Sequence, residues 1–382
     1  MRIVYFYPQF VYPAGTERII IDKANYLAEL YGYHVCLLTF QQGKHPFSYP
    51  LSDKVSHVDL DLPYDSLYGK NVLLRFWKWR HLDRVLQEKF NAFVASFQPD
   101  VIVSTTGSAR VCSIVTKCPF AAVRIAESHV DLRHQVEHAA HNGKTLRSKV
   151  RVWNDMLAIR KHIGRYDLLV ALSGTDAKDW SKCVKTTVIS NVVHLNPTGK
   201  YSSLQSKHVL FAGRYVPQKG LFDLLTIWAM VHQKHPDWHL DLFGYGELEK
   251  ALKKRAQQLQ SNIHIHQADT KIFDRYLESS LFVLTSYYEP FGLVMPEAMS
   301  CGLPVVAFNC PYGPEEIITD GVDGFIVENR DLQQFANRIC QLIESEELRI
   351  RMGRAGVESS QRFSAEHIMP KWKELFESFF KK

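Results

Sequence analysis

Two glutamates stand on either side of Gly292 in the segment YYEPFGLVMPEAMSCGLPVV, Glu289 before it and Glu297 after it. On one continuous helix, at about 100° per residue, their carboxylates would lie roughly 80° apart and roughly 12 Å along the axis. They could not share one proton or one metal ion in that way. Pro296 is tolerated only in a helix's first turn, so we expect a helix that begins between Gly292 and Pro296 and runs to Cys301. Glu289 then precedes the helix and Glu297 lies in its first turns, an arrangement suited to a polar ligand.

The elements that position these acids follow an alternating pattern of short apolar runs and longer amphipathic stretches. This is the rhythm of βα units around parallel sheets, whose ligands bind at the carboxyl ends of strands beside helix N-termini. In the first half we expect strands at 2–7, 34–39, 101–104, 121–125, 167–172 and 186–190. In the second half we expect strands at 208–212, 238–243, 262–266, 281–284, 304–307 and 324–327.

A segment rich in Pro, Gly and Ser at 191–206 interrupts this pattern and predicts a linker. A chain of 382 residues is too long for one ordinary core. We therefore predict an α/β fold with two Rossmann-like domains, 1–195 and 196–363, that face each other across a cleft. The remaining segment, 364–382, carries an apolar stripe and is expected to form a helix that crosses back to the first domain.

The composition, 46% hydrophobic and 23% charged, is that of a folded soluble protein. No apolar run reaches the ~18 residues of a membrane-spanning helix, and the first apolar run is too short for a signal peptide. The seven cysteines are scattered and include no CxxC pair, which favours small buried side chains in a reducing compartment over disulfides or a zinc site. We expect a cytoplasmic protein, at most peripheral on the inner face of the plasma membrane.

The charge is uneven along the chain. Residues 1–200 carry 26 Lys and Arg against 17 Asp and Glu, whereas residues 201–382 carry 20 against 23. The basic half includes two stretches, 71–84, which has aromatic residues at helical spacing, and 144–165. Such helices suit an anionic membrane surface or a lipid-linked acceptor, but they equally suit amphipathic helices that pack their aromatic side chains into the core. No nucleic-acid motif accompanies the charge, so we expect no nucleic-acid partner.

Several motifs, taken in their order along the chain, resemble those of family 4 retaining glycosyltransferases, which have the GT-B fold. EPFG at 289–292 is followed by EAMSCGLPVV at 297–306, NCPYGPEE at 309–316 and DGFIV at 323–327. Upstream, FAGRYVPQKG at 211–220 is similar to the family's other signature. Two glutamates at a fixed spacing are weak by themselves, whereas the ordered set is specific. The similarity covers essentially the whole chain.

The resemblance implies a nucleotide-sugar donor, with its diphosphate and two polyol surfaces. Arg214 and Lys219 would hold the diphosphate and neutralise the charge on the leaving UDP. Glu297 would take the ribose hydroxyls and Glu289 the transferred sugar, since carboxylates suit paired hydroxyls.

The resemblance also implies backbone and first-domain contacts. Phe291 and Gly292 would offer N–H groups near the transferred sugar, with Gly292 allowing close approach. Gly15 and Thr16 match the family's glycine-rich turn, with Ala14 where a second glycine is usual. His129, in the sequence ESH after the strand 121–125, matches a histidine that points at the donor sugar.

The family transfers sugar with retention and without a covalent enzyme intermediate, because the departing phosphate accepts the acceptor's proton. No protein nucleophile, metal or cofactor beyond the UDP-sugar is implied. Asp59-Leu-Asp61 mimics a DxD metal site, but it follows the strand-like run 55–58 in the acceptor domain and we interpret it as a strand end. Gly244-Tyr-Gly246 lacks the third glycine of a dinucleotide fingerprint and is expected to be a turn. His264 and His266 alternate with isoleucines, as on one face of a strand.

The sequence thus predicts a metal-independent hexosyltransferase that moves a hexose or N-acetylhexosamine from a UDP-sugar to a growing, lipid-linked or capsular glycan. The run at 309–314 resembles bacterial members, which favours galactose or N-acetylgalactosamine as the sugar. Two alternatives stay open: a nucleotide-sugar epimerase of the same fold, and a non-catalytic subunit that binds UDP-sugar at the membrane.

Overall fold

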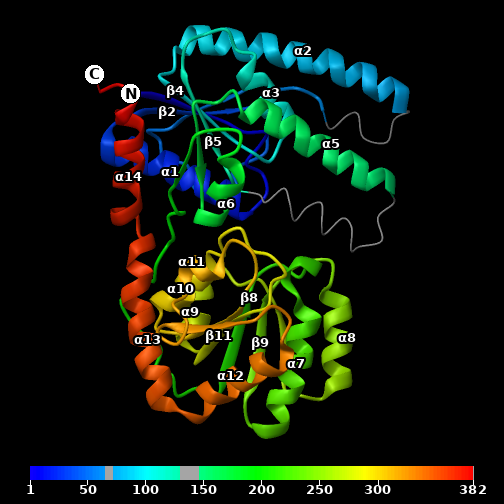
Figure 1. The fold of residues 1–382 in the computed structure, drawn as a ribbon, viewed down its shortest axis with the longest axis vertical. Coiled ribbons are helices and arrows are strands. Elements are labelled where there is room, and N and C mark those ends of the chain that lie inside the picture. Colours follow the sequence, from blue (N-terminus) through cyan, green and yellow to red (C-terminus); the bar gives the residue numbers. More distant parts are fainter. Residues whose placement is uncertain (65–71, 130–145, 382) are drawn as a thin grey trace. The chain divides into compact units, whose positions relative to one another are not determined.

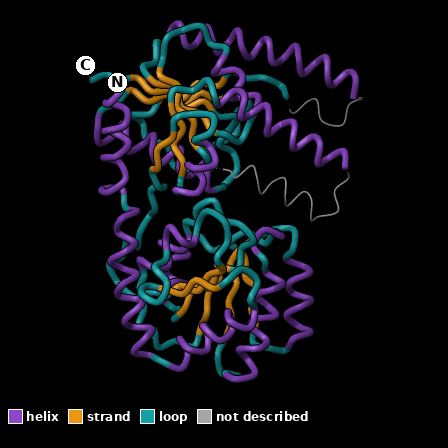
Figure 2. Tube along the Cα trace, viewed as in Figure 1, coloured by secondary structure: helices purple, strands orange, loops and turns teal. Residues whose placement is uncertain are grey.

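The computed structural model describes residues 1–64, 72–129 and 146–381 of the chain. These residues form two compact units (Figure 1). The first unit comprises Met1–Val192 together with Ile368–Lys382, and the second comprises Val193–His367. Within each unit the strands gather into one sheet and the helices lie outside it (Figure 2).

The first unit contains a seven-stranded sheet in the order β3-β2-β1-β4-β5-β6-β7, and every neighbouring pair is parallel. Its strands are β1 Arg2–Phe6, β2 His34–Thr39, β3 Ser56–Asp59, β4 Val101–Thr105, β5 Val123–Glu127, β6 Leu168–Ala171 and β7 Thr186–Val188. Its helices are α1 Gly15–Tyr31, α2 Val72–Phe97, α3 Ala109–Thr116, α5 Leu146–Ile163 and α6 Gly174–Trp180. The strand β4 is buried along its whole length, as expected for a parallel sheet covered on both faces.

The second unit contains a six-stranded parallel sheet in the order β10-β9-β8-β11-β12-β13. Its strands are β8 His208–Ala212, β9 His239–Gly244, β10 Ile263–Gln267, β11 Leu281–Leu284, β12 Val305–Phe308 and β13 Gly324–Val327. Its helices are α7 Leu221–Lys234, α8 Glu249–Leu259, α9 Ile272–Leu277, α10 Val294–Ser300, α11 Pro314–Ile317, α12 Leu332–Glu344 and α13 Glu346–Ser360.

In both sheets the strand order reverses beside the first strand of the unit. β1 lies between β2 and β4, and β8 lies between β9 and β11. Connections leave these neighbouring strands in opposite directions, and such switch points are where open α/β sheets bind ligands. The loops after β8 and β11 carry Arg214, Lys219, Glu289, Phe291 and Gly292.

The last helix, α14 Ala365–Ser378, contains residues of both units. Its first residues belong to the second unit, and from Ile368 onward it belongs to the first. Ile368, Met369, Trp372 and Phe376 are all buried, so this segment completes the core of the first unit. The predicted boundaries, 195/196 and 363/364, differ from this division by a few residues.

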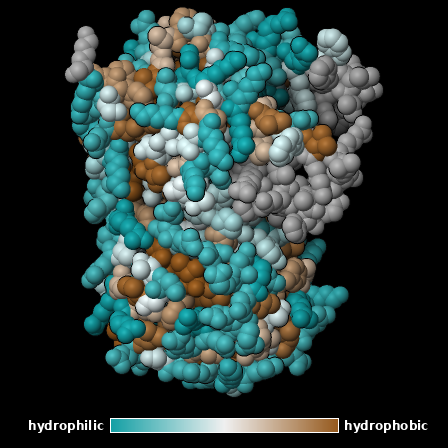
Figure 3. Space-filling model, viewed as in Figure 1, coloured by the Kyte–Doolittle hydropathy of each residue, from teal (hydrophilic) through white to brown (hydrophobic). Residues whose placement is uncertain are grey.

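The predicted strands are found to within two residues at each end. One shift matters for the site: β5 runs to Glu127, so this glutamate is the last residue of the strand rather than part of the loop after it. None of the helices in the described part of the chain is both long and apolar enough to span a bilayer. Hydrophilic side chains predominate on the face in Figure 3, and hydrophobic ones form separate patches.

Candidate active site

The loops after β8 and β11 bring Lys219 and Glu289 into direct contact. The Nζ atom of Lys219 donates to Oε2 of Glu289, and both residues are more than nine-tenths buried. Ser286 donates to the same carboxylate oxygen at 3.1 Å. The backbones of the two loops also pack closely. Gly220 has a φ of +61°, and a Cβ there would lie 2.2 Å from the carbonyl oxygen of Thr285. Two predicted site residues are therefore one buried ion pair at the switch point.

The segment after Glu289 needs glycine to turn into the helix α10. Gly292 has a φ of +88°, and a Cβ there would lie 2.6 Å from Cε of Met295 and 2.9 Å from Cγ of Glu289. Phe291 is buried against the ring of Phe363, with 5.4 Å between the ring centroids. Glycine is therefore required at position 292 by the fold of this loop, and its close approach to a sugar stays a prediction.

Glu297 lies in the first turn of α10 and is 4% exposed. The hydroxyl of Tyr276 donates to its Oε2 atom at 3.4 Å. The helix begins at Val294 and ends at Ser300, inside the range expected from Pro296 and Gly302. The two glutamates therefore have different environments: Glu289 contacts a cation, and Glu297 accepts from a phenol.

Arg214 is exposed, and among the described residues no hydrogen bond or ion pair engages its side chain. Its loop is held against the turn after β9: Tyr215 N–H donates to the carbonyl of Tyr245 at 2.7 Å, and a Cβ on Gly246 would lie 2.5 Å from the carbonyl oxygen of Tyr215. The turn at 244–246 thus supports the loop of Arg214. One predicted cation is paired and the other is available to a ligand.

A further residue, Arg330, supports this site, and sequence analysis did not identify it. Its guanidinium donates to the carbonyl oxygens of Thr285 at 2.9 Å and Ser286 at 2.8 Å, and to Oδ2 of Asp223 at 2.7 Å. The same group lies 4.0 Å from the ring centroid of Tyr287. Arg330 adopts a φ of 67°, which is uncommon for a residue other than glycine. It fixes the loop that carries Ser286 and Glu289.

In the first unit, Gly15 and Thr16 begin α1, and Ala14 is the residue before the helix. His129 follows β5 and is 8% exposed. Its Nε2 atom lies 2.6 Å from Oε2 of Glu127. No described contact joins His129 to Gly15 or Thr16.

Glu127 also binds a buried lysine from α1. Nζ of Lys23 donates to Oε2 of Glu127, and Lys23 is 2% exposed. Burial alone would raise the pKa of Glu127, but the charge of Lys23 and the contact with His129 outweigh burial and lower that pKa to about 2. Burial lowers the pKa of Lys23, and the attraction of Glu127 opposes that shift. Glu127 is therefore a carboxylate held between two nitrogen donors.

Asp59 and Asp61, which mimic a DxD metal site in the sequence, have structural roles at the end of β3. Asp59 ends β3 and accepts from Thr39 Oγ1 at 2.8 Å and from the N–H of Gly43 at 2.8 Å, so it ties down the loop after β2. Asp61 has a left-handed backbone, with a φ of 47°. Within the residues that the structure describes, no group of three or more His, Cys, Asp or Glu side chains could hold a metal ion.

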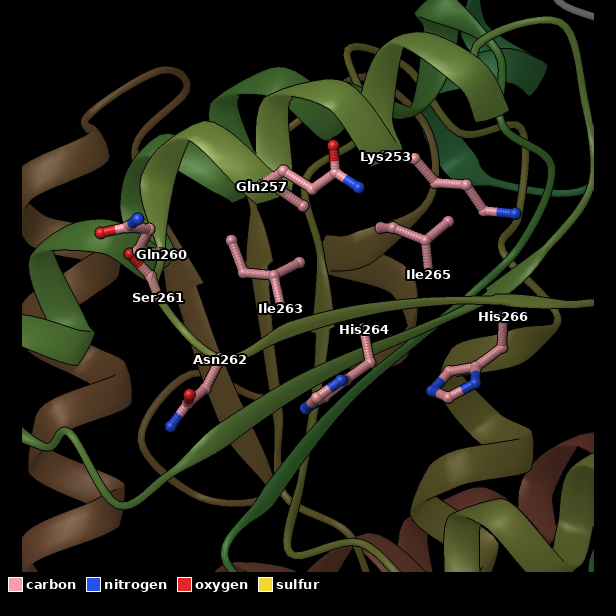
Figure 4. A pocket seen from close by; sticks show the side chains of 10 residues that line it. Lys253, Gln257, Gln260, Ser261, Asn262, Ile263, His264, Ile265 and His266 are labelled. Atoms are coloured by element: carbon pink, nitrogen blue, oxygen red, sulfur yellow. The ribbon is translucent and has the colours of Figure 1, made fainter.

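The histidines of β10 lie on one face of their strand. Ile263 and Ile265 point toward α8, whereas His264 and His266 point to the opposite side (Figure 4). His266 Nε2 lies 2.7 Å from Oδ1 of Asp241, and His264 Nε2 lies 3.2 Å from Nδ1 of His239. These contacts belong to a polar patch on the edge of the sheet.

Comparisons with known proteins identify glycosyltransferases as similar to this chain. An uncharacterized glycosyltransferase of Haemophilus influenzae is 28% identical over 367 residues, which cover 94% of this chain and 95% of that one. An amylovoran biosynthesis glycosyltransferase of Erwinia amylovora is 33% identical over 192 residues, 49% of this chain and 54% of that one. The crystal structure of Anabaena HepE in complex with UDP and glucose superimposes with a TM-score of 0.74 and 21% identity, covering 98% of this chain and 99% of that chain.

The family described as glycosyl transferases group 1 matches residues 200–359, which include every donor residue predicted in the second unit. The two parallel sheets, with seven and six strands, are those of GT-B glycosyltransferases. In these residues and in its fold, the chain is therefore similar to the group 1 glycosyltransferases.

Proposed function

We propose that this protein is a metal-independent, retaining glycosyltransferase of family 4 that transfers a hexose or N-acetylhexosamine from a UDP-sugar to a growing glycan. The observation that carries the proposal is the contact between Lys219 and Glu289 at the switch point of the second sheet. Arg214, whose side chain has no partner among the described residues, lies in the same loop as Lys219. A cation beside a carboxylate suits a ligand with phosphate and hydroxyl groups close together, because the cation can bind the phosphate and the carboxylate can accept from the hydroxyls.

The diphosphate of the donor would bind Arg214 and Lys219. Arg214 is free to form a bidentate contact, and Lys219 would exchange part of its contact with Glu289 for a phosphate oxygen. Both cations would stabilise the charge that grows on UDP as the bond to the sugar breaks.

The two glutamates would bind different sugars. Glu297 would accept from the ribose hydroxyls, and Glu289 from hydroxyls of the transferred sugar. Phe291 and Gly292 would add backbone N–H groups beside that sugar. The HepE structure with UDP and glucose supports a UDP-sugar, and galactose or N-acetylgalactosamine remains our preferred sugar.

Retention would proceed on one face of the sugar, with the acceptor hydroxyl attacking as the phosphate departs and passing its proton to that phosphate. No protein nucleophile is required. Burial raises the pKa of the nearby thiol of Cys310 to about 12, so this thiol stays protonated. In the first unit, His129 would contact the transferred sugar, and the amides of Gly15 and Thr16 would approach the donor phosphate.

The acceptor would be a lipid-linked or capsular glycan, in keeping with the amylovoran biosynthesis relative. The first unit offers a surface for an anionic membrane. On α2, Trp77 is 70% exposed beside the exposed Arg80 and Arg84, while Trp79 packs against the core. Trp79 is thus a core residue, whereas the exposed Trp77 would contact the membrane.

A second exposed stripe supports the same surface. Val150, Trp153 and Leu157, at helical spacing on α5, are each about half exposed, and Arg160 and Lys161 follow them. The helix α3 contacts both α2 and α5. Apolar side chains with adjacent cations are the pattern of an interfacial helix on anionic lipid.

A thermal-shift screen of nucleotide sugars, followed by a transfer assay with the stabilising donor, tests the proposal. We expect stabilisation by UDP and by one or two UDP-sugars, and incorporation of labelled sugar into an acceptor glycan with the α or β configuration of the donor retained. Release of an epimerised free sugar without an acceptor would favour the epimerase. Stabilisation by UDP-sugars without turnover on any acceptor would favour the non-catalytic subunit.

A further inference from the structure

The side chain of His129 belongs to a buried cluster of three residues, Lys23, Glu127 and His129. Lys23 lies on α1, Glu127 is the last residue of β5, and His129 follows two residues later. Oε2 of Glu127 accepts from Lys23 Nζ on one side and lies 2.6 Å from His129 Nε2 on the other. All three side chains are at least nine-tenths buried. In the described part of the chain, the second oxygen of Glu127 has no hydrogen-bond partner.

A buried ion pair such as that of Lys23 and Glu127 contributes little net stability to a fold. Removing a carboxylate and an ammonium from water is unfavourable, and proteins with apolar residues of the same volume in such places are often as stable. Lys23 has little other polar contact to offset that cost, since its Nζ atom otherwise faces the rings of Trp372, at 4.1 Å, and Tyr5, at 5.7 Å. A role beyond stability is the better explanation for a charged pair in this position.

The geometry defines the state of the imidazole. Because Glu127 is held as a carboxylate, it only accepts hydrogen bonds, so Nε2 of His129 must carry the proton that it donates. The other ring nitrogen, Nδ1, then points away from the carboxylate. The backbone is fixed too, since Ser128 N–H donates to the carbonyl of Val170 at 3.0 Å and Trp180 donates to Ser128 Oγ at 3.3 Å.

We infer that Glu127 and Lys23 are positioning residues for His129: Glu127 fixes the orientation and tautomer of the imidazole through Nε2, and Lys23 holds the Glu127 carboxylate in place, so that Nδ1 is the atom presented to the transferred sugar. This inference rests on the proposed function. It assigns a task to a lysine that lies more than 100 residues from the histidine and belongs to none of the family motifs.

The test combines nitrogen NMR with kinetics. In long-range ¹H–¹⁵N spectra of histidine-labelled protein, the His129 signal is the one lost in His129→Gln. We expect the Nε2–H tautomer in the wild type and a mixture of tautomers in Glu127→Gln, because an amide can either accept from Nε2 or donate to it. In the transfer assay, Glu127→Gln and Lys23→Met should lower kcat by about 10- to 100-fold, the loss typical when a carboxylate that orients a metal-binding histidine is removed, while UDP affinity stays unchanged.

Asp241→Asn is the matched control. It also replaces a largely buried carboxylate that binds imidazoles, those of His208 and His266, each at 2.7 Å. It should leave kcat and the His129 signal unchanged.

An Nδ1–H tautomer in the wild type, or full kcat in Glu127→Gln, would overturn the inference. If Glu127→Gln does not fold, the wild-type tautomer and Lys23→Met decide the question. Failure of the proposed function gives a different result, namely no transfer by the wild type or full transfer by His129→Gln, and the tautomer of the wild type still tests the positioning.

Discussion

Lys219 and Glu289 are 70 residues apart in the chain, yet the ammonium of one touches the carboxylate of the other at the switch point of the second sheet. Without ligand, the two side chains therefore form an ion pair. A donor that binds there must either contact both side chains of this pair or separate them. The roles of Lys219 and Glu289 are therefore coupled, and variants of either residue report on both.

The first prediction concerns the diphosphate. Arg214→Ala and Lys219→Ala should each weaken UDP binding by about 1.5–3 kcal/mol, the value of a charge-assisted hydrogen bond. Calorimetric titration with UDP measures this effect. Lys219→Ala should also lower the melting temperature, because it leaves the buried Glu289 without its cation, whereas Arg214→Ala should not.

Lys250→Ala, on the exposed face of α8, is the control for the loss of a cation from the same unit. It should change neither UDP affinity nor melting temperature. Unchanged UDP affinity in both Arg214→Ala and Lys219→Ala would contradict the clamp.

The second prediction separates the two glutamates. Glu297→Gln should weaken UDP and UDP-sugar alike, since ribose is common to both. Glu289→Gln should not weaken UDP, because it frees Lys219 for the phosphates, but it should lower kcat by about 10²–10³-fold as the sugar loses a carboxylate that attracts its growing positive charge. The measurements are UDP affinity and kcat for each variant. Equal losses of UDP affinity would show that both acids act on one group.

The third prediction concerns metal ions. Because Arg214 and Lys219 are proposed to hold the diphosphate, transfer should continue in EDTA. Asp59→Ala should lower stability by about 1–3 kcal/mol through its lost hydrogen bonds to the loop after β2, with little change in kcat. Asp61→Asn, which keeps a residue that tolerates the left-handed backbone, should change neither. Loss of turnover on chelation, restored by Mn²⁺ or Mg²⁺, would revive a metal site.

The fourth prediction concerns the membrane surface. Protein should sediment with anionic vesicles at low salt and release at high salt, where screening shortens to several ångströms. Trp77→Ser with Arg80→Ser and Arg84→Ser should abolish sedimentation. Arg75 belongs to the same basic stretch, but its side chain lies outside the described residues. The control removes three exposed cations of α8 in the other unit: Lys250, Lys254 and Arg255. Equal sedimentation with neutral and anionic vesicles would contradict an electrostatic surface.

The fifth prediction concerns Arg330. Arg330→Lys keeps the charge but cannot reach two carbonyls and a carboxylate at once, so the loop of Ser286 should loosen. We expect UDP-sugar affinity to fall by about 1–3 kcal/mol. Arg338→Lys, which also removes a guanidinium from an aromatic ring, is the control and should leave affinity unchanged. Normal UDP-sugar affinity in Arg330→Lys would show that the loop keeps its shape without the guanidinium.

Much of the fold could be predicted because its signals are local. Apolar runs mark the buried strands, and Pro296 with Gly302 limits the helix α10, so the positions of Glu289 and Glu297 followed from neighbouring residues. The boundary of β5 was less accurate, because Glu127 is a charged residue at the end of a buried strand and its polarity resembles that of a loop.

The supporting residues could not be predicted, because their signals depend on long-range contacts. Lys23 looks like an ordinary polar residue of an amphipathic helix, and only the folded chain places it beside Glu127. Arg330 follows an ordinary strand, and nothing local indicates that it binds two carbonyls of a distant loop. For both Lys23 and Arg330, the order of strands in the sheet determines which distant residues lie within hydrogen-bonding distance.

The division of α14 between the two units has a consequence for the order in which the protein folds. Trp372, which covers the ammonium of Lys23, follows the entire second unit in the chain. During synthesis the first unit emerges from the ribosome early, but it must wait with an incomplete core until the second unit has been translated. Nascent chains stalled before Ile368 should therefore be sensitive to proteases in the first unit, even when its sheet has formed.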